Sequence, residues 1–343
     1  MPRERFNVFV GDNGQGKTNL LETIFVVASL RSFRTSRLAD LVAFGRAEAT
    51  IGARVVKDDL TRLYEITLAE GSRKVRLDGK APRPLSRYFG GFNVVVFTPE
   101  DLTLPRGTPG ERRRFLDRGV FNLEPAYLGV AQDYDRVLKN RNTVLRKSED
   151  VPRAQLDGML EVYDQQLAAL AVQVIATRKR FLDSIRVELA RAFASIMRST
   201  ATASARYMSK TLDASADDII VMLKDARVKD LATQATQVGP HRDDVGFFLD
   251  GHDAGGFASQ GQLRAIMLAW KTAELAVLSR EHGDSPILLL DDVSSELDPH
   301  RNRFLFEHLA TLAGQCFITT THASHVLLAD SRADYRIENG RIL

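Results

Sequence analysis

The pattern of apolar and polar residues divides the chain into stretches with different periods. An apolar run at 6–10 ends at Gly11 and predicts a buried strand, which a glycine-rich turn and a helical pattern follow. Apolar and polar residues alternate between 47 and 79, with an Asp-Gly turn signal, and this predicts an antiparallel meander. Another apolar run at 93–102, stopped by Pro99, predicts a second buried strand.

The middle of the chain has a helical period. Between Met159 and Val238 there is neither glycine nor proline, and apolar residues recur at helical spacing, so we expect a largely helical region with one long helix. Continuous apolar runs at 286–292 and 315–322 then predict strands inside a parallel sheet. The chain therefore reads as an α/β head with a mixed sheet, an antiparallel β-subdomain and an inserted, mainly helical lobe.

Three segments follow from this reading. We expect the N-terminal part of the head at 1–107, the helical lobe at 108–200 and the C-terminal part of the head at 201–343. The whole chain of 343 residues has a net charge of only +3, whereas residues 105–200 hold 17 Lys and Arg against 12 Asp and Glu. Any surface for a polyanion must therefore come from local clustering of charge.

Composition excludes several classes of protein. No run approaches the ~20 apolar residues that a membrane-spanning helix needs, and the first residues lack the apolar core of a signal peptide. A single cysteine, Cys316, excludes a disulfide framework and a cysteine-based zinc site. We expect a cytoplasmic protein with no membrane contact, and we expect Cys316 and Trp270 to lie in the core.

A glycine-rich segment carries the most specific chemistry. GDNGQGKT matches G-x-x-x-x-G-K-[ST] between a predicted strand and a predicted helix, where backbone N–H groups surround phosphates. Lys17 would reach the β- and γ-phosphates, and the Thr18 hydroxyl would bind Mg²⁺. The alternative is a glycine turn with a solvated lysine. The predicted ATP-binding residues here are Gly11, Asp12, Asn13, Gly14, Gln15, Gly16, Lys17 and Thr18.

An acidic pair follows the apolar run at 287–290. Asp291 and Asp292 come at the C-terminal tip of a buried strand, where ligands bind in open α/β sheets. Asp291 would hold Mg²⁺, and Asp292 would orient or deprotonate the attacking water. A pair that only caps the next segment is the alternative, and two adjacent buried acids repel each other unless a cation is present.

Three further motifs occur in a fixed order. Ser259, Gln260, Gly261 and Gln262 precede a predicted helix, residues 294–298 follow the acidic pair, and His322 follows the last apolar run. A serine hydroxyl at a helix N-terminus can bind an anion, and His322 can donate to a γ-phosphate oxygen. Taken singly, these motifs are equally well read as a helix cap, a turn and a structural histidine.

These motifs are the P-loop, signature, Walker B, D-loop and switch histidine of the ABC-type ATPase superfamily. Within it the chain resembles the RecF family over nearly its whole length, most specifically in GPHRDD at 239–244 together with SQGQ at 259–262. Transport ATPases usually carry LSGGQ and a glutamate where this chain has SQGQ and Asp292. The resemblance implies an ABC-type P-loop ATPase head.

The resemblance also implies a mechanism and partners. RecF-like proteins bind ATP with Mg²⁺ and form a head-to-tail homodimer that slow, DNA-stimulated hydrolysis resets. Lys17, Asp291, Asp292 and His322 would be catalytic. Contacts in trans would come from Ser259, Gln260, Gly261, Gln262 and Asp298. Such dimers bind single-stranded, gapped and junction DNA, and with RecO and RecR they load RecA in recombinational repair, replication-fork recovery and SOS induction.

Two departures from the family pattern are visible. The resemblance implies another strand and an arginine near the nucleotide before the P-loop; either the start of the sequence is misassigned or shortened, or the chain lacks this edge strand and one nucleotide contact. No glutamine follows the strand at 94–97, where Thr98, Glu100 and Asp101 stand instead of a Q-loop residue.

Basic residues cluster in the predicted lobe. We expect DNA contacts from Arg112, Arg113, Arg114, Lys139 and Arg141, with binding that depends on salt and little on sequence. One alternative is a solvated helix face paired with acids of the same helix, and another, for Arg113 and Arg114, is a role in stabilising the junction of the head and the lobe. The segment 241–244 either lines a dimer interface or turns between strands.

Two other functions fit parts of the sequence. An ABC transporter ATPase subunit should carry a Q-loop glutamine and a catalytic glutamate, and neither is clear here. A structural SMC-like protein needs an insertion of hundreds of residues ending in a hinge, whereas the lobe expected here is short.

Overall fold

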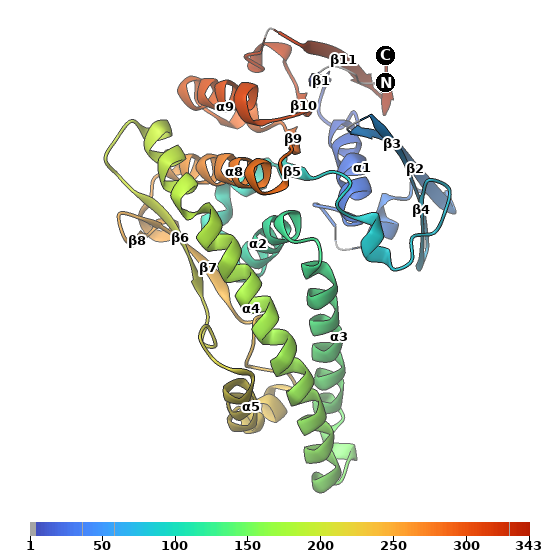
Figure 1. Cartoon of the computed structure of the whole chain (residues 1–343), viewed down its shortest axis with the longest axis vertical. Coiled ribbons are helices and arrows are strands. Elements are labelled where there is room, and N and C mark those ends of the chain that lie inside the picture. Colours follow the sequence, from blue (N-terminus) through green and yellow to red (C-terminus); the bar gives the residue numbers. More distant parts are fainter. Residues whose placement is uncertain (1–4, 36, 58, 329) are drawn as a thin grey trace. The chain divides into compact units, whose positions relative to one another are not determined.

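The computed structural model describes residues 5–35, 37–57, 59–328 and 330–343 (Figure 1). It contains two compact units, which are described separately. The first unit comprises Met1–Thr103, Ser195–Met197 and Arg264–Leu343, and the second comprises Leu104–Ala194 and Arg198–Leu263.

A six-stranded sheet forms the centre of the first unit. Neighbouring strands of this sheet run parallel, except that β12, at one edge, runs antiparallel to β11. Its order is β12 (Arg341–Ile342), β11 (Arg332–Glu338), β1 (Phe6–Val10), β10 (Cys316–Thr320), β9 (Ile287–Asp291) and β5 (Val94–Phe97). The strands predicted at 6–10, 93–102, 286–292 and 315–322 are present at 6–10, 94–97, 287–291 and 316–320, and the second is shorter than predicted because a 3-10 helix begins at Pro99.

Register brings the functional motifs to one edge of this sheet. Val10 pairs with Thr320, and Thr319 pairs with Asp291, so β1, β10 and β9 end side by side. The carboxyl ends of parallel strands are where ligands bind in such sheets. Helix α1 (Lys17–Ser29) leaves β1 at this edge.

A second sheet in this unit is the predicted antiparallel meander. It consists of β2 (Glu48–Lys57), β3 (Leu60–Ala69) and β4 (Ser72–Leu77). One face buries Tyr64, Ile66 and Leu68 in a cluster that includes Val26 of α1. The mixed α/β fold with an antiparallel subdomain is therefore confirmed.

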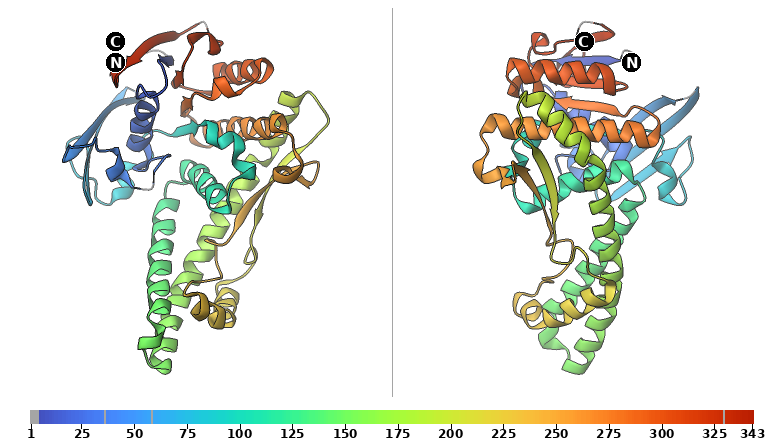
Figure 2. Two further views of the ribbon diagram at one scale, coloured as in Figure 1. Left: turned by 180° about the vertical axis from the view of Figure 1, so that it is seen from behind. Right: turned by 60° about the vertical axis from the view of Figure 1, so that its left-hand side comes forward.

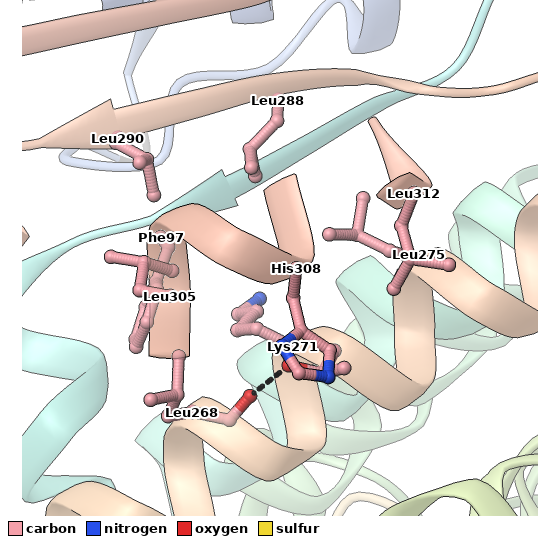
Figure 3. A pocket seen from close by; sticks show the side chains of 10 residues that line it. Phe97, Leu268, Lys271, Leu275, Leu288, Leu290, Leu305, His308 and Leu312 are labelled. Carbon is pink, nitrogen blue, oxygen red and sulfur yellow. Dashed lines mark hydrogen bonds between the residues drawn. The ribbon is translucent and has the colours of Figure 1, made fainter. Parts of the chain in front are cut away.

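Helices α8 (Gln260–His282) and α9 (Pro299–Leu312) contribute apolar side chains that lie beside those of β5 and β9. Trp270 and Cys316 are fully buried, as expected from the sequence. Figure 3 shows a small pocket lined by leucines of α8, α9 and β9, with Lys271 and His308 among them. Burial obliges the Lys271 ammonium to find a partner, and it lies 3.1 Å from a Glu274 carboxylate oxygen.

The second unit is mainly helical (Figure 2). Helix α4 is the long helix that the glycine-free stretch predicts, although its last residues group with the first unit. The elements of this part of the chain are α2 (Pro109–Leu123), α3 (Tyr127–Arg146), α4 (Arg153–Met197), β6 (Ala203–Met208), α5 (Ala216–Asp225), α6 (Arg227–Thr233), β7 (Asp244–Leu249), β8 (His252–Asp253) and α7 (Ala254–Phe257).

Within the described residues, six 3-10 helices lie between these elements. They are Leu38–Leu41, Leu85–Tyr88, Pro99–Arg106, Ser148–Asp150, Val293–Glu296 and Ala323–His325. Among the described residues, no helix is long and apolar enough to cross a membrane.

The boundaries of the two units differ from those expected. The sequence assigns 201–343 to the head, but Arg198–Leu263 groups with the helical unit. The reason lies in its partners: Asp244 of β7 accepts two hydrogen bonds from Arg112 of α2, and the Pro240 carbonyl accepts one from Arg178 of α4. Strand-like sequence alone does not reveal to which unit a strand belongs.

Candidate nucleotide-binding site

The glycine-rich loop has the backbone that a phosphate cradle requires. Gly14 and Gly16 have φ values of 82° and 93°, a region that side chains with a Cβ rarely adopt. At Gly11 a Cβ would lie 2.5 Å from the carbonyl oxygen of Ile337, so only glycine fits. Gln15 accepts from the Asn339 N–H at 2.6 Å, so its side chain ties the loop to the β11–β12 turn.

Lys17 lies inside this loop and is almost fully buried. Its Nζ donates to the carbonyl oxygens of Gly11 and Asp12, at 2.7 and 2.9 Å. A buried ammonium that donates to neutral carbonyls can exchange them for phosphate oxygens. The loop therefore presents a positive charge beside the first N–H groups of α1, where the helix dipole also favours an anion.

The predicted Mg²⁺ pair comes together in the structure. The Thr18 hydroxyl donates to Asp291 Oδ1 at 2.9 Å, and the Thr319 hydroxyl donates to the same oxygen at 2.8 Å. No cluster of three or more His, Cys, Asp or Glu that could hold a metal occurs in the described part of the chain. One hydroxyl and one carboxylate fit Mg²⁺, which keeps several waters and shares phosphate oxygens. Thr319 was not identified from the sequence.

Asp292 lies directly after Asp291 and has a buried carboxylate oxygen, Oδ1. This Oδ1 has no hydrogen-bond partner among the described residues, and the φ of Asp292, 51°, lies in the left-handed region. Burial raises the pKa of Asp292; the Ser295 hydrogen bond and Lys17 act in the opposite direction, and Asp291 adds to the increase. An unpaired acceptor beside Lys17 and Asp291 suits a water, which can donate a hydrogen bond to it.

His322 follows β10 at the same edge of the sheet and is exposed. Its ring centroid lies 5.3 Å from that of His325, a residue that the sequence analysis did not single out. His325 Nδ1 is buried and has no hydrogen-bond partner in the described part of the chain, while the His325 carbonyl accepts from Asn302 at 2.8 Å. The T-H-A-S-H spacing was the only available signal for His325.

The segment after β5 offers no Q-loop glutamine. Asp101 is buried, accepts from the Thr98 N–H at 3.3 Å and lies 3.9 Å from Lys271 Nζ. Its carboxylate therefore stabilises the start of this 3-10 helix and compensates a buried lysine. Glu100 is exposed.

The signature motif begins α8, and its residues up to Leu263 belong to the second unit. The Ser259 N–H donates to Gln262 Oε1 at 2.8 Å, and the Gln262 N–H donates to Ser259 Oγ at 3.3 Å. This reciprocal capping box satisfies the first N–H groups of the helix. Within one chain, Ser259 and Gln262 therefore act as a helix cap, and Gln260 is exposed.

Asp298 caps α9 in a similar way. Its carboxylate accepts from the N–H groups of His300 and Arg301, both at 3.1 Å, and from the Arg301 side chain. Burial opposes ionisation, but these hydrogen bonds outweigh it and lower the pKa of Asp298.

Comparison with known proteins identifies the family. A model of the RecF/RecN/SMC N-terminal domain matches residues 1–341. The DNA replication and repair protein RecF of Geobacter sp. (strain M21) is 41% identical over 351 residues, covering 100% of this chain and 94% of the relative. The chain belongs to the RecF family. The RecF of Myxococcus xanthus (strain DK1622) is 41% identical over 334 residues, covering 95% of this chain and 87% of the relative.

Solved structures agree with this assignment. A structure of the recombination mediator protein RecF-ATP in the RecFOR pathway has a TM-score of 0.89 at 29% identity, covering 99% of this chain and 91% of that chain. An Smc head bound to the C-winged helix domain of ScpA reaches 0.52 at 15% identity over 99% of this chain and 90% of that chain, and so shares the fold alone. The resemblance to the RecF family is confirmed over the whole chain, and the transporter and SMC alternatives are set aside.

The candidate DNA contacts in this RecF-family chain differ in their exposure and in their partners within the second unit. Arg112 pairs with Asp244 at 2.5 Å, and Arg113 donates to the Asp243 carbonyl at 2.7 Å. Both guanidinium groups therefore hold the strand β7 onto α2 while remaining partly exposed, and their contact with DNA stays a prediction. Arg114 and Lys139 are exposed, as a contact to phosphate requires.

Arg141 is the clearest correction. Its side chain is fully buried, with Nε 2.7 Å from Asp164 and Nη1 2.6 Å from Asp230. A guanidinium held between two buried carboxylates cannot reach a DNA phosphate, so Arg141 is a structural residue of the second unit.

The GPHRDD segment is also held within the second unit. His241 Nδ1 lies 2.7 Å from the Tyr134 hydroxyl and Nε2 lies 2.9 Å from the Thr236 carbonyl, contacts that a neutral ring protonated at Nε2 satisfies by donating to Thr236 and accepting from Tyr134. Burial lowers the pKa of His241 to about 4; the Thr236 bond opposes this change and nearby Arg242 adds to it.

Proposed function

We propose that this protein is an ATP-dependent DNA-binding protein of recombinational repair that uses slow, DNA-stimulated ATP hydrolysis as a switch. One observation carries the nucleotide part of this proposal. Thr18, Asp291 and the unpartnered Asp292 oxygen lie at the strand ends beside a P-loop with a buried lysine. This arrangement supports a site for a triphosphate with its metal ion.

The chemistry follows from the roles that these groups support. Lys17 would exchange the Gly11 and Asp12 carbonyls for β- and γ-phosphate oxygens. Thr18 and Asp291 would hold Mg²⁺, which when bound neutralises charge on the phosphates. Asp292 would orient a water and accept its proton as the water oxygen bonds to the γ-phosphorus and ADP leaves.

The proposed switch is a homodimer formed around two nucleotides. Ser259, Gln260, Gly261, Gln262 and Asp298 of one copy would contact the triphosphate held by the other, and His322 would contact the γ-phosphate. An exposed helix N-terminus capped by Ser259 supports this role, because N–H groups of a helix start suit an anion. Hydrolysis would remove the γ-phosphate and release the dimer.

DNA and protein partners complete the proposal. Exposed Arg114 and Lys139 support binding to single-stranded, gapped or junction DNA through phosphates. A solved relative carries the description of a recombination mediator in the RecFOR pathway. We therefore place this protein in the cytoplasm with RecO and RecR, loading RecA during repair, replication-fork recovery and SOS induction.

Oligomeric state tests the proposal directly. Light scattering should show a dimer only with ATP and Mg²⁺ for the wild type, and a persistent dimer without turnover for Asp292→Asn. Ser259→Arg should bind ATP but stay monomeric. Arg191→Gln, an exposed side chain of α4 whose ion pair spans one helical turn, is the matched control and should dimerise normally. A wild type that stays monomeric with ATP and gapped DNA contradicts the proposal.

A further inference from the structure

One side chain holds the loop that leads into the signature serine. Arg106, at the end of the 3-10 helix Pro99–Arg106, donates from Nε to the Gly255 carbonyl at 3.1 Å and from Nη2 to the Ala258 carbonyl at 2.9 Å. Ala258 immediately precedes Ser259. The planar guanidinium thus bridges two carbonyls three residues apart, which a lysine with a single Nζ cannot do in the same geometry.

The loop at 255–258 packs directly against the backbone at 105–107, which is called the Arg106 segment below. Ala254 and Ala258 are buried, and the Asp253 carboxylate accepts from the Gly256 N–H at 2.8 Å. A Cβ at Gly255 would lie 2.6 Å from the Pro105 carbonyl oxygen, so the two backbones are in direct contact. Any shift of the Arg106 segment would therefore move the backbone before Ser259.

A second arginine fixes the Arg106 segment in turn. Arg112 Nη1 donates to the Gly107 carbonyl at 2.5 Å, and the other side of its guanidinium pairs with Asp244. The order of contacts is thus Asp244, Arg112, the backbone at 105–107, Arg106, and the loop at 255–258. All of these residues lie in the second unit.

We infer that Arg106 is a positioning residue for the contact that Ser259 makes with the nucleotide of a second copy. This inference rests on the proposed function, because it assigns a role within that dimer. Arg106 does not touch ATP; it sets the place and direction of the Ser259 N–H, hydroxyl and helix start through the Ala258 carbonyl. Since Arg106 is itself exposed, its loss should alter the dimer far more than the fold.

The first measurement separates binding from assembly. Arg106→Gln should bind a fluorescent ATP analogue as a monomer within about twofold of the wild type, because its own P-loop is intact. Loss of hydrogen bonds from a charged donor should weaken ATP-dependent dimerisation about tenfold or more, with a matching loss of kcat. Arg106→Lys should recover part of the loss, and Arg191→Gln should behave as the wild type.

Mixing two variants tests the action in trans. A dimer of Arg106→Gln with Lys17→Arg contains one site with an intact P-loop and an intact signature from the opposite copy. In an equimolar mixture about half of the dimers are mixed and each has one intact site, so ATPase activity should recover to roughly a quarter of the wild-type value, well above that of either variant alone. If Arg106 served its own nucleotide site, every site in the mixture would be defective and no recovery would occur.

The outcomes distinguish the two proposals. Failure of the wild type itself to dimerise with ATP and Mg²⁺ would overturn the proposed function, and the inference with it. Normal dimerisation of the wild type without recovery in the mixture, or normal dimerisation of Arg106→Gln alone, would overturn only the role of Arg106.

Discussion

Replacement of Arg141 separates a structural role from DNA binding. Arg141→Met removes the cation and leaves the carboxylates of Asp164 and Asp230 buried. Breaking a buried ion pair from one side costs about 3–5 kcal/mol. Asp164 keeps Arg227 at 2.8 Å, and Asp230 keeps the Gln237 N–H at 2.9 Å, so the lower end applies. We expect a loss of about 3 kcal/mol in the free energy of unfolding.

Lys139 provides the matched comparison, because it lies two residues earlier on the same helix α3 and is exposed. Lys139→Met should leave stability within about 0.5 kcal/mol of the wild type and should weaken binding to a gapped duplex, with a smaller dependence on salt. Urea unfolding gives the first quantity, and fluorescence anisotropy at two salt concentrations gives the second.

Arg141→Met should lose stability and keep its affinity for DNA, whereas Lys139→Met should keep its stability and lose affinity for DNA. Folded Arg141→Met, measured below the start of its unfolding transition, should bind DNA as the wild type does. If Arg141→Met instead keeps its stability and loses DNA affinity, the buried ion pairs do not exist in solution and the original reading of Arg141 as a DNA contact is right.

Two further predictions concern packing and protonation in the second unit. Gly119→Ala would place a Cβ 2.4 Å from the buried Phe181 ring, so it should lower the free energy of unfolding, measured in urea, by about 1–3 kcal/mol. The control Gly158→Ala, at an exposed position of α4 where a Cβ meets no atom within 4 Å, should raise it by up to about 1 kcal/mol. Equal effects of the two variants would contradict the packing at Gly119. Burial lowers the pKa of His241 to about 4, so the unfolded chain binds a proton more readily than the folded one, and the free energy of unfolding falls as pH falls below the unfolded pKa. Between pH 7.5 and 5.0 the free energy of unfolding of the wild type should therefore fall by about 2 kcal/mol more than that of His241→Gln. Parallel pH profiles for the two proteins would refute the neutral buried histidine.

The nucleotide site could be predicted from sequence because its parts are local. The apolar strand that ends in a glycine-rich turn indicates the position of the P-loop lysine at one strand end of a parallel sheet. The apolar strand that ends in an acid indicates the position of Asp291 at another. The contact between Thr18 and Asp291, 273 residues apart, then follows from neighbouring strand ends. Thr319 was missed because its hydroxyl is one of three in a threonine run, and only register shows that it faces Asp291.

The charged residues of the lobe required the structure, although one signal was present. Arg141 lies at helical spacing from Tyr134, Val137, Val144 and Leu145, which are all buried, so it falls on the apolar stripe of α3. Lys139 lies off that stripe. The position of an arginine on a helix face therefore predicted burial better than its place in a basic cluster did, but its partners on α4 and α6 are too distant in sequence to be found.

Two aspartates near the end of β9 should respond in opposite ways to the same substitution. Burial raises the pKa of Asp292, which has an oxygen without a partner and lies beside Asp291, so Asp292→Asn should raise the melting temperature without nucleotide while abolishing ATP turnover. Asp298 accepts hydrogen bonds from Arg301 and the start of α9, so Asp298→Asn should lower the melting temperature. If Asp292→Asn destabilises the protein as Asp298→Asn does, Asp292 is a structural cap, and its unpaired oxygen does not mark the place of a ligand.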